Sequence, residues 1–206
     1  MEKSTNSAQP AFWNQRYASA ETPWALPKVP AALRSFLKRT QTRGRVLIPG
    51  CGTDYRVIAA FADAGFDVTA IDFSPVAVAE TKKALGNFGP SRTGRIMRAD
   101  FFRSDFGRHF DLVYERTFLC AMHPRRWRGY ARRVAELLRP RGRLIGIFFY
   151  GTEPDPPPYP ISTAEAQEIF GNYFRLVRDG KVSDSVTMFA GMERWQEWER
   201  AAKFSR

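Results

Sequence analysis

From Gly44 onward the chain alternates short apolar runs with stretches of helical periodicity, and this alternation limits the possible folds more than any other feature. The apolar runs, which we predict to be strands, are residues 45–49, 67–72, 94–98, 110–115 and 144–150. Helical patterns cover residues 55–64, 75–86, 127–138 and 162–170. Strands that alternate with helices pair in parallel, with the helices packed on the sheet. The sequence therefore predicts an α/β fold with a mostly parallel sheet.

Turn and capping residues mark the ends of several helices. Gly65 ends the first helix, and Ser74 followed by Pro75 is a favourable start for the second. Ser162 and Glu165 match a capping box at the start of the last one. These local signals agree with the periodicity.

The last quarter of the chain is less clear. Residues 174–177, an Asp-Gly turn at 179–180 and residues 185–190 predict a closing hairpin. Trp195 and Trp198 are three residues apart, as on one helix face, yet a returning edge strand is also consistent with this stretch.

The composition is that of one folded domain, which we predict to span residues 1–206. At this length about 70% of the chain's surface can be buried. The 17 Phe, seven Tyr and five Trp residues exclude a disordered polybasic chain. Cys51 and Cys120 are too few for a disulfide framework, and with two histidines we expect no metal site. We see no leader and no membrane-spanning run, and expect a cytoplasmic monomer.

The net charge of +11 has two interpretations. Arginines gather between residues 125 and 143, and such a cluster is typical of a contact with nucleic acid. The apolar residues from Trp127 to Leu138 recur at helical spacing, which places most of these arginines on the opposite face. We favour a solvated helix face and keep a nucleic-acid methyltransferase or binding protein as the alternative.

The first forty residues differ from the rest of the chain. Trp13, Tyr17 and Trp24 are spread through a stretch whose prolines prevent a long helix. Aromatic side chains are common both in cores and in ligand sites, so the segment is either an apolar flap on the core or a lid over a ligand. We predict a lid segment of residues 1–40 ahead of a core of residues 44–206.

The residues with the clearest chemical meaning follow the first two strands. Gly50 and Gly52 flank Cys51 in a turn between strand and helix, and Asp72 ends the next strand. Glycines let the backbone approach a ligand closely, and an acid about 20 residues later can accept hydrogen bonds from both hydroxyls of a ribose. This pattern suits a cofactor that contains adenosine.

Two further observations narrow the choice of cofactor. A dinucleotide fingerprint needs a third glycine where Tyr55 stands. Asp100 and Phe101, after the third strand, offer an acceptor for an adenine amino group and a ring beside the base, with a helix N-cap as the structural alternative for Asp100. Together these residues favour S-adenosylmethionine over a nicotinamide or flavin.

The chain resembles the thiopurine methyltransferase family and its relatives, the plant-type halide and thiol methyltransferases, which are class I S-adenosylmethionine-dependent methyltransferases. The resemblance covers nearly the whole chain. It rests on the aromatic N-terminal segment, a Pro-Gly-Cys-Gly turn at residues 49–52, a Pro-Pro-Tyr loop at 157–159, and residues 70–74, 100–102, 110–116, 118–121 and 136–140. It implies a Rossmann-like domain with a mostly parallel seven-stranded sheet and helices on both faces.

By that resemblance the cofactor is S-adenosylmethionine, released as S-adenosylhomocysteine. Its expected contacts are Trp13, Tyr17, Trp24, Gly50, Cys51, Gly52, Asp72, Phe73, Asp100, Phe101 and Arg116. The position of Arg116 is tyrosine in the plant-type enzymes and arginine in the thiopurine enzymes, which speaks against halide as the main substrate.

Sulfonium chemistry explains why few catalytic side chains are visible. The cofactor activates its own methyl group, so the protein mainly aligns a soft nucleophile and excludes water. Arg116, our candidate catalytic residue, would raise the thiolate fraction of a bound thiol or orient an anionic acceptor. An ion pair with Glu115 or Asp72 is the structural alternative. We interpret Cys51 and Cys120 as packing residues.

The run Asp-Pro-Pro-Pro-Tyr at residues 155–159 is similar to a motif of nucleic-acid amino-methyltransferases, but that motif follows the fourth strand and this run follows the fifth. We expect a proline-rich loop at residues 151–160, with Phe118 and Tyr159 as substrate-binding residues and loop rigidity as the alternative role of Tyr159.

The predicted acceptor is the sulfur of a small thiol, hydrosulfide or thiopurine-like molecule. O- or N-methylation of a small heteroaromatic metabolite is the alternative.

Overall fold

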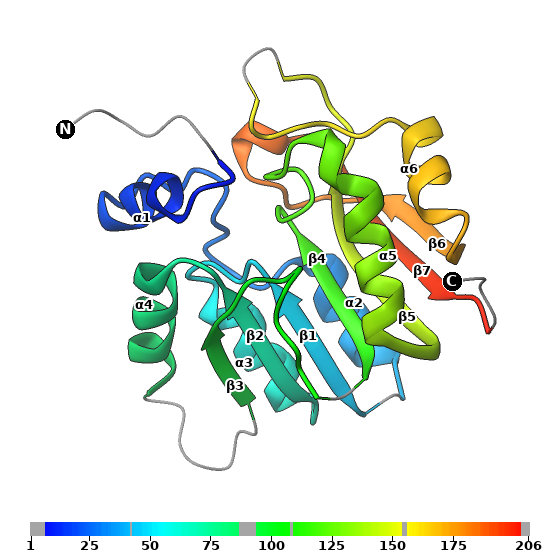
Figure 1. The fold of residues 1–206 in the computed structure, drawn as a ribbon, viewed down its shortest axis with the longest axis horizontal. Coiled ribbons are helices and arrows are strands. Elements are labelled where there is room, and N and C mark those ends of the chain that lie inside the picture. The colour runs from blue at the N-terminus through cyan, green and yellow to red at the C-terminus, as the bar shows by residue number, and fades with distance from the viewer. Residues whose placement is uncertain (1–6, 42, 87–93, 108, 154–155, 203–206) are drawn as a thin grey trace.

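One seven-stranded sheet lies between helices in the computed structural model of the protein, which describes residues 7–41, 43–86, 94–107, 109–153 and 156–202 (Figure 1). The strands are β1 (Arg45–Pro49), β2 (Asp67–Asp72), β3 (Gly94–Arg98), β4 (Phe110–Arg116), β5 (Leu138–Phe149), β6 (Phe174–Lys181) and β7 (Glu193–Arg200). The helices are α1 (Pro10–Ala18), α2 (Ala31–Arg39), α3 (Tyr55–Asp63), α4 (Pro75–Leu85), α5 (Trp127–Leu137) and α6 (Thr163–Phe170), with 3-10 turns η2 (Pro124–Arg126) and η3 (Thr187–Phe189). No helix in the described ranges is long and apolar enough to cross a membrane.

The strand order β3-β2-β1-β4-β5-β7-β6 confirms the predicted fold class. Strands β1 to β5 pair in parallel, and β7 runs antiparallel between β5 and β6. The carboxyl ends of β3, β2, β1 and β4 therefore lie next to one another at one edge of the sheet. Open α/β sheets bind their ligands at this edge.

Helices cover both faces of the sheet. One apolar core contains the buried faces of α5 and α6, and the other contains those of α2 and α3 (Figure 1). Leu33 and Phe36 of α2 are almost fully buried, and the Phe36 ring lies 5.9 Å from that of Trp195. Residues 31–39 thus belong to the core, which shortens the predicted lid. Residues 1–6, also assigned to the lid, lie outside the described residues.

The predicted capping residues act as expected. The Ser74 hydroxyl accepts a hydrogen bond from the Ala77 N–H at the start of α4. Ser162 and Glu165 form a reciprocal capping box at the start of α6. Gly65, two residues after the end of α3, has a φ of 85°, which favours glycine. The residues predicted from local signals therefore mark where these helices begin or end.

The predicted closing hairpin is wrong. Strand β6 continues through Asp179 and Gly180 and pairs with β7, whereas residues 187–189 form the turn η3. The Asp179 carboxylate accepts two hydrogen bonds from Arg194 on β7, at 2.8 and 2.6 Å. This cross-strand pair keeps Asp-Gly inside a strand, against its local preference for a turn. The Trp195 and Trp198 stretch is the strand β7 and not a helix.

Strand β5 starts earlier than predicted. It begins at Leu138, directly after α5, and Leu138 pairs with Phe110 before a register shift in β4. The Pro140 to Gly142 stretch, which we placed between helix and strand, is therefore part of the strand. Pairing with β4 overrides the local turn signal.

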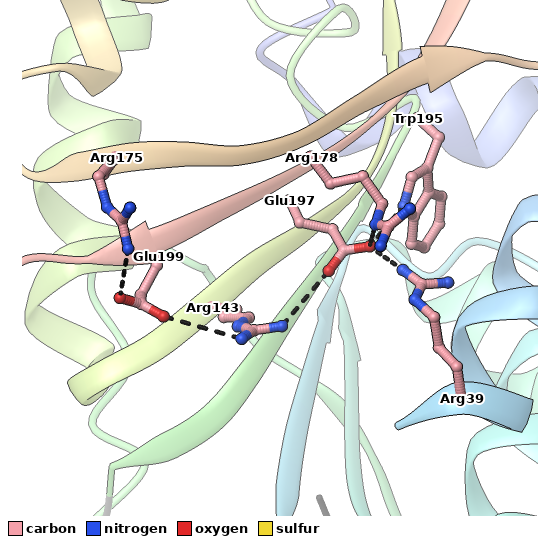
Figure 2. A network of polar contacts seen from close by, with 7 residues as sticks. All are labelled: Arg39, Arg143, Arg175, Arg178, Trp195, Glu197 and Glu199. Carbon is pink, nitrogen blue, oxygen red and sulfur yellow. Dashed lines mark hydrogen bonds and ion pairs between the residues drawn. The ribbon is translucent and has the colours of Figure 1, made fainter. Parts of the chain in front are cut away.

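A network of arginine and glutamate side chains covers part of the sheet where α2 ends (Figure 2). Glu197 on β7 is buried, and its carboxylate forms ion pairs with Arg39, with Arg143 at 3.4 Å and with Arg178 at 3.4 Å. The Trp195 indole N–H donates to the same carboxylate at 3.1 Å. Here three guanidinium groups surround one buried carboxylate, and we call these contacts the Glu197 network.

Candidate active site

A cavity of about 810 Å³ opens over the carboxyl ends of the central strands. This volume suits a site for a cofactor and a small substrate, since ligand pockets usually measure about 300 to 1,000 Å³. Every residue that the sequence analysis selected lines it: Trp13, Tyr17, Trp24, Gly50, Cys51, Gly52, Asp72, Phe73, Asp100, Phe101, Arg116, Phe118 and Tyr159.

The N-terminal segment covers this cavity. Helix α1 stands apart from the two helix layers, above α4 (Figure 1). The Trp24 ring meets the rings of Trp13 and Tyr17 edge to face, at centroid distances of 5.6 and 6.4 Å. A hydrogen bond of 2.6 Å from the Ser74 hydroxyl to the Asn14 side chain fastens α1 to the start of α4. Residues 7–26 therefore form the part of the segment that can act as a lid.

The glycine turn is shaped for close approach. Gly50 and Gly52 have φ values of 57° and 53°, in the left-handed region that glycine adopts without strain. A Cβ atom on Gly50 would lie 2.3 Å from the Phe118 ring, and one on Gly52 would lie 2.8 Å from the Tyr17 hydroxyl. Between them, the Cys51 thiol is buried and its pKa is raised by burial, so it is a packing group.

Asp72 connects this turn with the next strand end. One carboxylate oxygen accepts the Gly52 N–H at 3.0 Å and the other accepts the Ser74 N–H at 2.8 Å. Burial raises the pKa of Asp72, and these backbone hydrogen bonds oppose that effect. A carboxylate has about four lone-pair sites, so Asp72 keeps acceptor capacity beyond its backbone hydrogen bonds. The residues present thus fit a ribose diol.

Asp100 and Phe101 follow the end of β3 and line the cavity there. The Asp100 carboxylate accepts the Phe102 N–H at 2.8 Å and caps a turn, since no helix follows in the described residues 101–107. Phe101 is buried, and its ring meets the Phe118 ring at 5.4 Å. Arg133, which we placed on a solvated helix face, donates to the Phe101 and Ser104 carbonyls at 3.2 and 2.6 Å.

Arg116 ends β4 inside the cavity. Its side chain donates to the Trp24 carbonyl at 2.8 Å, so it contacts the lid directly. Among the described residues no ion pair joins Arg116 to Glu115 or Asp72, and the structural alternative to its catalytic role is therefore not observed. The next residue, Thr117, has a φ of 59°, where a β-branched residue is strained. Such strain is often found at functional sites.

Glu115 holds the loop that follows Arg116. Its carboxylate accepts the N–H groups of Phe118 and Leu119 at 2.9 Å each, and the Tyr130 hydroxyl donates to it at 2.7 Å. Burial raises the pKa of Glu115 to about 7. The position of the Phe118 ring thus depends on a buried carboxylate on the opposite side of β4 from Arg116.

The sequence analysis missed several residues of the cavity. They include Asp54, Tyr114, Arg126, Met188 and Phe189. Met188 and Phe189 belong to η3, which we predicted as a strand, so no local pattern marked them. Arg126 lies over the Phe102 ring at 4.1 Å and belongs to the arginine cluster of residues 125–143, most of which we expected on a solvated helix face. Burial raises the pKa of Asp54, and the nearby Arg116 opposes this.

Comparisons with known proteins agree with this architecture. The family model described as thiopurine S-methyltransferase matches residues 8–200. A probable thiol methyltransferase 2 of Arabidopsis thaliana is 31% identical over 93% of this chain and 86% of its own length. A thiopurine S-methyltransferase of Vibrio cholerae is 28% identical over 78% of this chain and 80% of its own length.

A solved structure shares the fold. The 1,6-didemethyltoxoflavin-N1-methyltransferase of Burkholderia thailandensis superposes with a TM-score of 0.73 at 21% identity, covering 93% of this chain and 87% of its own. The family match spans nearly the whole described chain, including the lid, the glycine turn and the end of β4. The chain therefore belongs to the thiopurine S-methyltransferase family of S-adenosylmethionine-dependent methyltransferases.

Proposed function

We propose that the protein transfers a methyl group to the sulfur of a small thiol, hydrosulfide or thiopurine-like acceptor. The observation that carries this proposal is Arg116, a residue only 9% exposed that lines the cavity. The cavity walls also include Phe118, Met122 and Met188. A cation inside such walls favours a soft anion over a strongly hydrated one.

The cavity residues divide into two groups with different roles. The glycine turn, Asp72, Phe73, Asp100, Phe101 and the lid aromatics would hold S-adenosylmethionine. When bound, that cofactor would supply a sulfonium methyl group: the acceptor sulfur would form a new bond to the methyl carbon while the bond from that carbon to the sulfonium sulfur breaks, its electron pair leaving with S-adenosylhomocysteine. Phe118 and Tyr159 would bound the acceptor, and Arg116 would favour its thiolate form or orient its charge.

The names of the relatives support this acceptor class. One is a probable thiol methyltransferase, one a thiopurine S-methyltransferase, and a third, of Brassica oleracea, a thiocyanate methyltransferase 25% identical to this chain. All three names denote acceptors in which sulfur is the soft atom.

A panel of acceptors tests the proposal. Hydrosulfide, small thiols, 6-mercaptopurine, iodide and hydroxy-heteroaromatics are each incubated with the protein and methyl-labelled S-adenosylmethionine. We expect label in the sulfur acceptors, with turnover reduced at least tenfold in Arg116→Ala. Label only in the oxygen or nitrogen acceptors would refute sulfur as the acceptor atom. Binding of S-adenosylhomocysteine, measured in parallel, shows that each protein is folded.

A further inference from the structure

Two residues that line the cavity each carry a buried polar atom with no hydrogen-bond partner among the described residues. These atoms are the Tyr114 hydroxyl and the Nε–H of Arg116. An unpaired buried polar group destabilises a protein, so a native structure usually supplies a partner. In a ligand site, that partner is the ligand.

Both donors project from the same strand. Tyr114 and Arg116 are two residues apart on β4, so their side chains leave the same face of the sheet. Their Cα atoms are about 6.6 Å apart at the usual rise of a strand. One ligand atom can therefore lie within reach of both groups.

Neither side chain can turn away to find another partner. Tyr114 is 2% exposed, and its ring packs edge to face against Phe61 at 5.4 Å. Arg116 is fixed at its far end by the hydrogen bond from Nη2 to the Trp24 carbonyl. The two donors are thus held in place while the lid is closed.

The chemistry of the two groups defines what they can bind. A guanidinium N–H only donates. Burial raises the pKa of Tyr114, and Arg116 opposes this, but the balance keeps the phenol protonated and able to donate. Two donors on one face of β4, one of them part of a cation, match a single anionic atom. A neutral sulfur can accept from the same donors, but more weakly, because hydrogen bonds to a charged acceptor are stronger than those between neutral groups.

We infer that the Tyr114 hydroxyl, together with the Nε–H of Arg116, forms a two-donor site that binds the anionic sulfur of the acceptor and selects small sulfur monoanions over neutral acceptors. This inference rests on the proposed function and adds a specificity-determining residue to it. Tyr114 is a positioning group and forms no covalent bond in the reaction.

Binding to the enzyme saturated with S-adenosylhomocysteine tests the inference without turnover. Thiocyanate is the anionic probe and thiourea the neutral one, titrated by calorimetry into wild type and Tyr114→Phe. Loss of one hydrogen bond to a charged group should weaken thiocyanate binding at least tenfold, whereas loss of one to the neutral thiourea sulfur should weaken its binding by less than about fivefold. Equal thiocyanate affinity in both proteins would overturn the inference. So would an equal loss for both probes, because the hydroxyl would then only shape the cavity.

Two controls separate this result from other effects. Tyr150→Phe removes the hydroxyl that donates to Gln196 outside the cavity, and it should leave the affinity for both probes unchanged.

In turnover, Tyr114→Phe should raise the KM for hydrosulfide about tenfold with kcat changed less than threefold. If wild type binds thiocyanate through Tyr114 but methylates no sulfur acceptor, the proposed function fails and the anion site stands. If sulfur acceptors are methylated and Tyr114→Phe behaves like wild type, only the inference fails.

Discussion

At the residue scale, the site depends on buried carboxylates that hold backbone N–H groups in position. Asp72 fixes the glycine turn through Gly52, and Glu115 fixes the loop that carries Phe118. Hydrogen bonds from neutral donors to a carboxylate are stronger than those between neutral groups. Replacing either acid by its amide keeps the shape but puts an NH2 group opposite a backbone donor.

Asp72→Asn should weaken binding of S-adenosylhomocysteine at least tenfold, because the amide can accept at only one atom. Isothermal titration calorimetry measures the dissociation constant. Asp105→Asn is the matched control, since Asp105 accepts the Gly107 N–H at 2.8 Å in a turn outside the cavity. A dissociation constant that stays at the wild-type value in Asp72→Asn would show that the ribose binds elsewhere.

Glu115 makes stability depend on pH. Its pKa is about 7 in the folded protein, above the ordinary 4.5, so the folded state binds this proton more tightly than the unfolded state does. The resulting stabilisation is complete below about pH 4.5 and is lost as the pH rises through 7, by about 3 kcal/mol. Glu115→Gln cannot titrate, and its free energy of unfolding in urea should vary less over this range. Parallel pH profiles for both proteins would contradict this prediction.

At the element scale, the lid is held by few contacts. Helix α1 contains a single buried residue, Phe12, and reaches the core through the Asn14 to Ser74 hydrogen bond. Arg116 holds the other end of the lid at the Trp24 carbonyl. Elements with few buried apolar contacts open more easily than the rest of a fold, so the lid can open while the sheet stays folded.

Asn14→Ala should favour the open lid. Loss of one hydrogen bond predicts an increase in the KM for S-adenosylmethionine of about fivefold, together with faster tryptic cleavage at Arg16. S-adenosylhomocysteine should slow this cleavage. Gln15→Ala, on the same helix, is the control and should match wild type. Unchanged cleavage and KM in Asn14→Ala would show that this hydrogen bond does not hold the lid.

At the scale of the whole molecule, the Glu197 network joins α2 to three strands of the sheet (Figure 2). Burial and the neighbouring Arg178 and Arg143 lower the pKa of Arg39, which shows how closely the positive charges are placed. Part of the positive charge is therefore not simply solvated, because three arginines pair with one buried glutamate. A carboxylate in this position is needed to hold the guanidinium groups together.

Glu197→Gln should reduce the free energy of unfolding by about 3 to 5 kcal/mol, because it leaves the surrounding cations without their buried partner. Arg175→Gln removes an exposed cation that pairs with Glu199 and should change stability by less than about 1 kcal/mol. Urea unfolding of both variants tests the difference. Binding of S-adenosylhomocysteine by the folded variants should not change, since these residues lie outside the cavity.

Much of this molecule was predictable from local patterns. The strands β1 to β4, the helices α3, α4 and α5, and the capping residues Ser74 and Ser162 depend on interactions within a few residues of the chain, which the sequence displays directly. The glycine turn and Asp72 were recognisable for the same reason, since their spacing along the chain sets their place at the strand ends.

Tertiary structure decided what depends on distant partners. Asp179 lies in a strand because Arg194 pairs with it, and α2 joins the core because Phe36 meets Trp195. Met188 lines the cavity because η3 precedes the antiparallel strand β7. Only the burial of the Tyr114 hydroxyl distinguishes this residue from any other strand tyrosine. The sequence by itself determined the order of most elements, because their signals are local, and it predicted the residues expected to hold the cofactor. Only the tertiary structure added Tyr114, Met188 and Phe189 to the cavity wall, through contacts between residues far apart in the chain, whose free energy no local pattern contains.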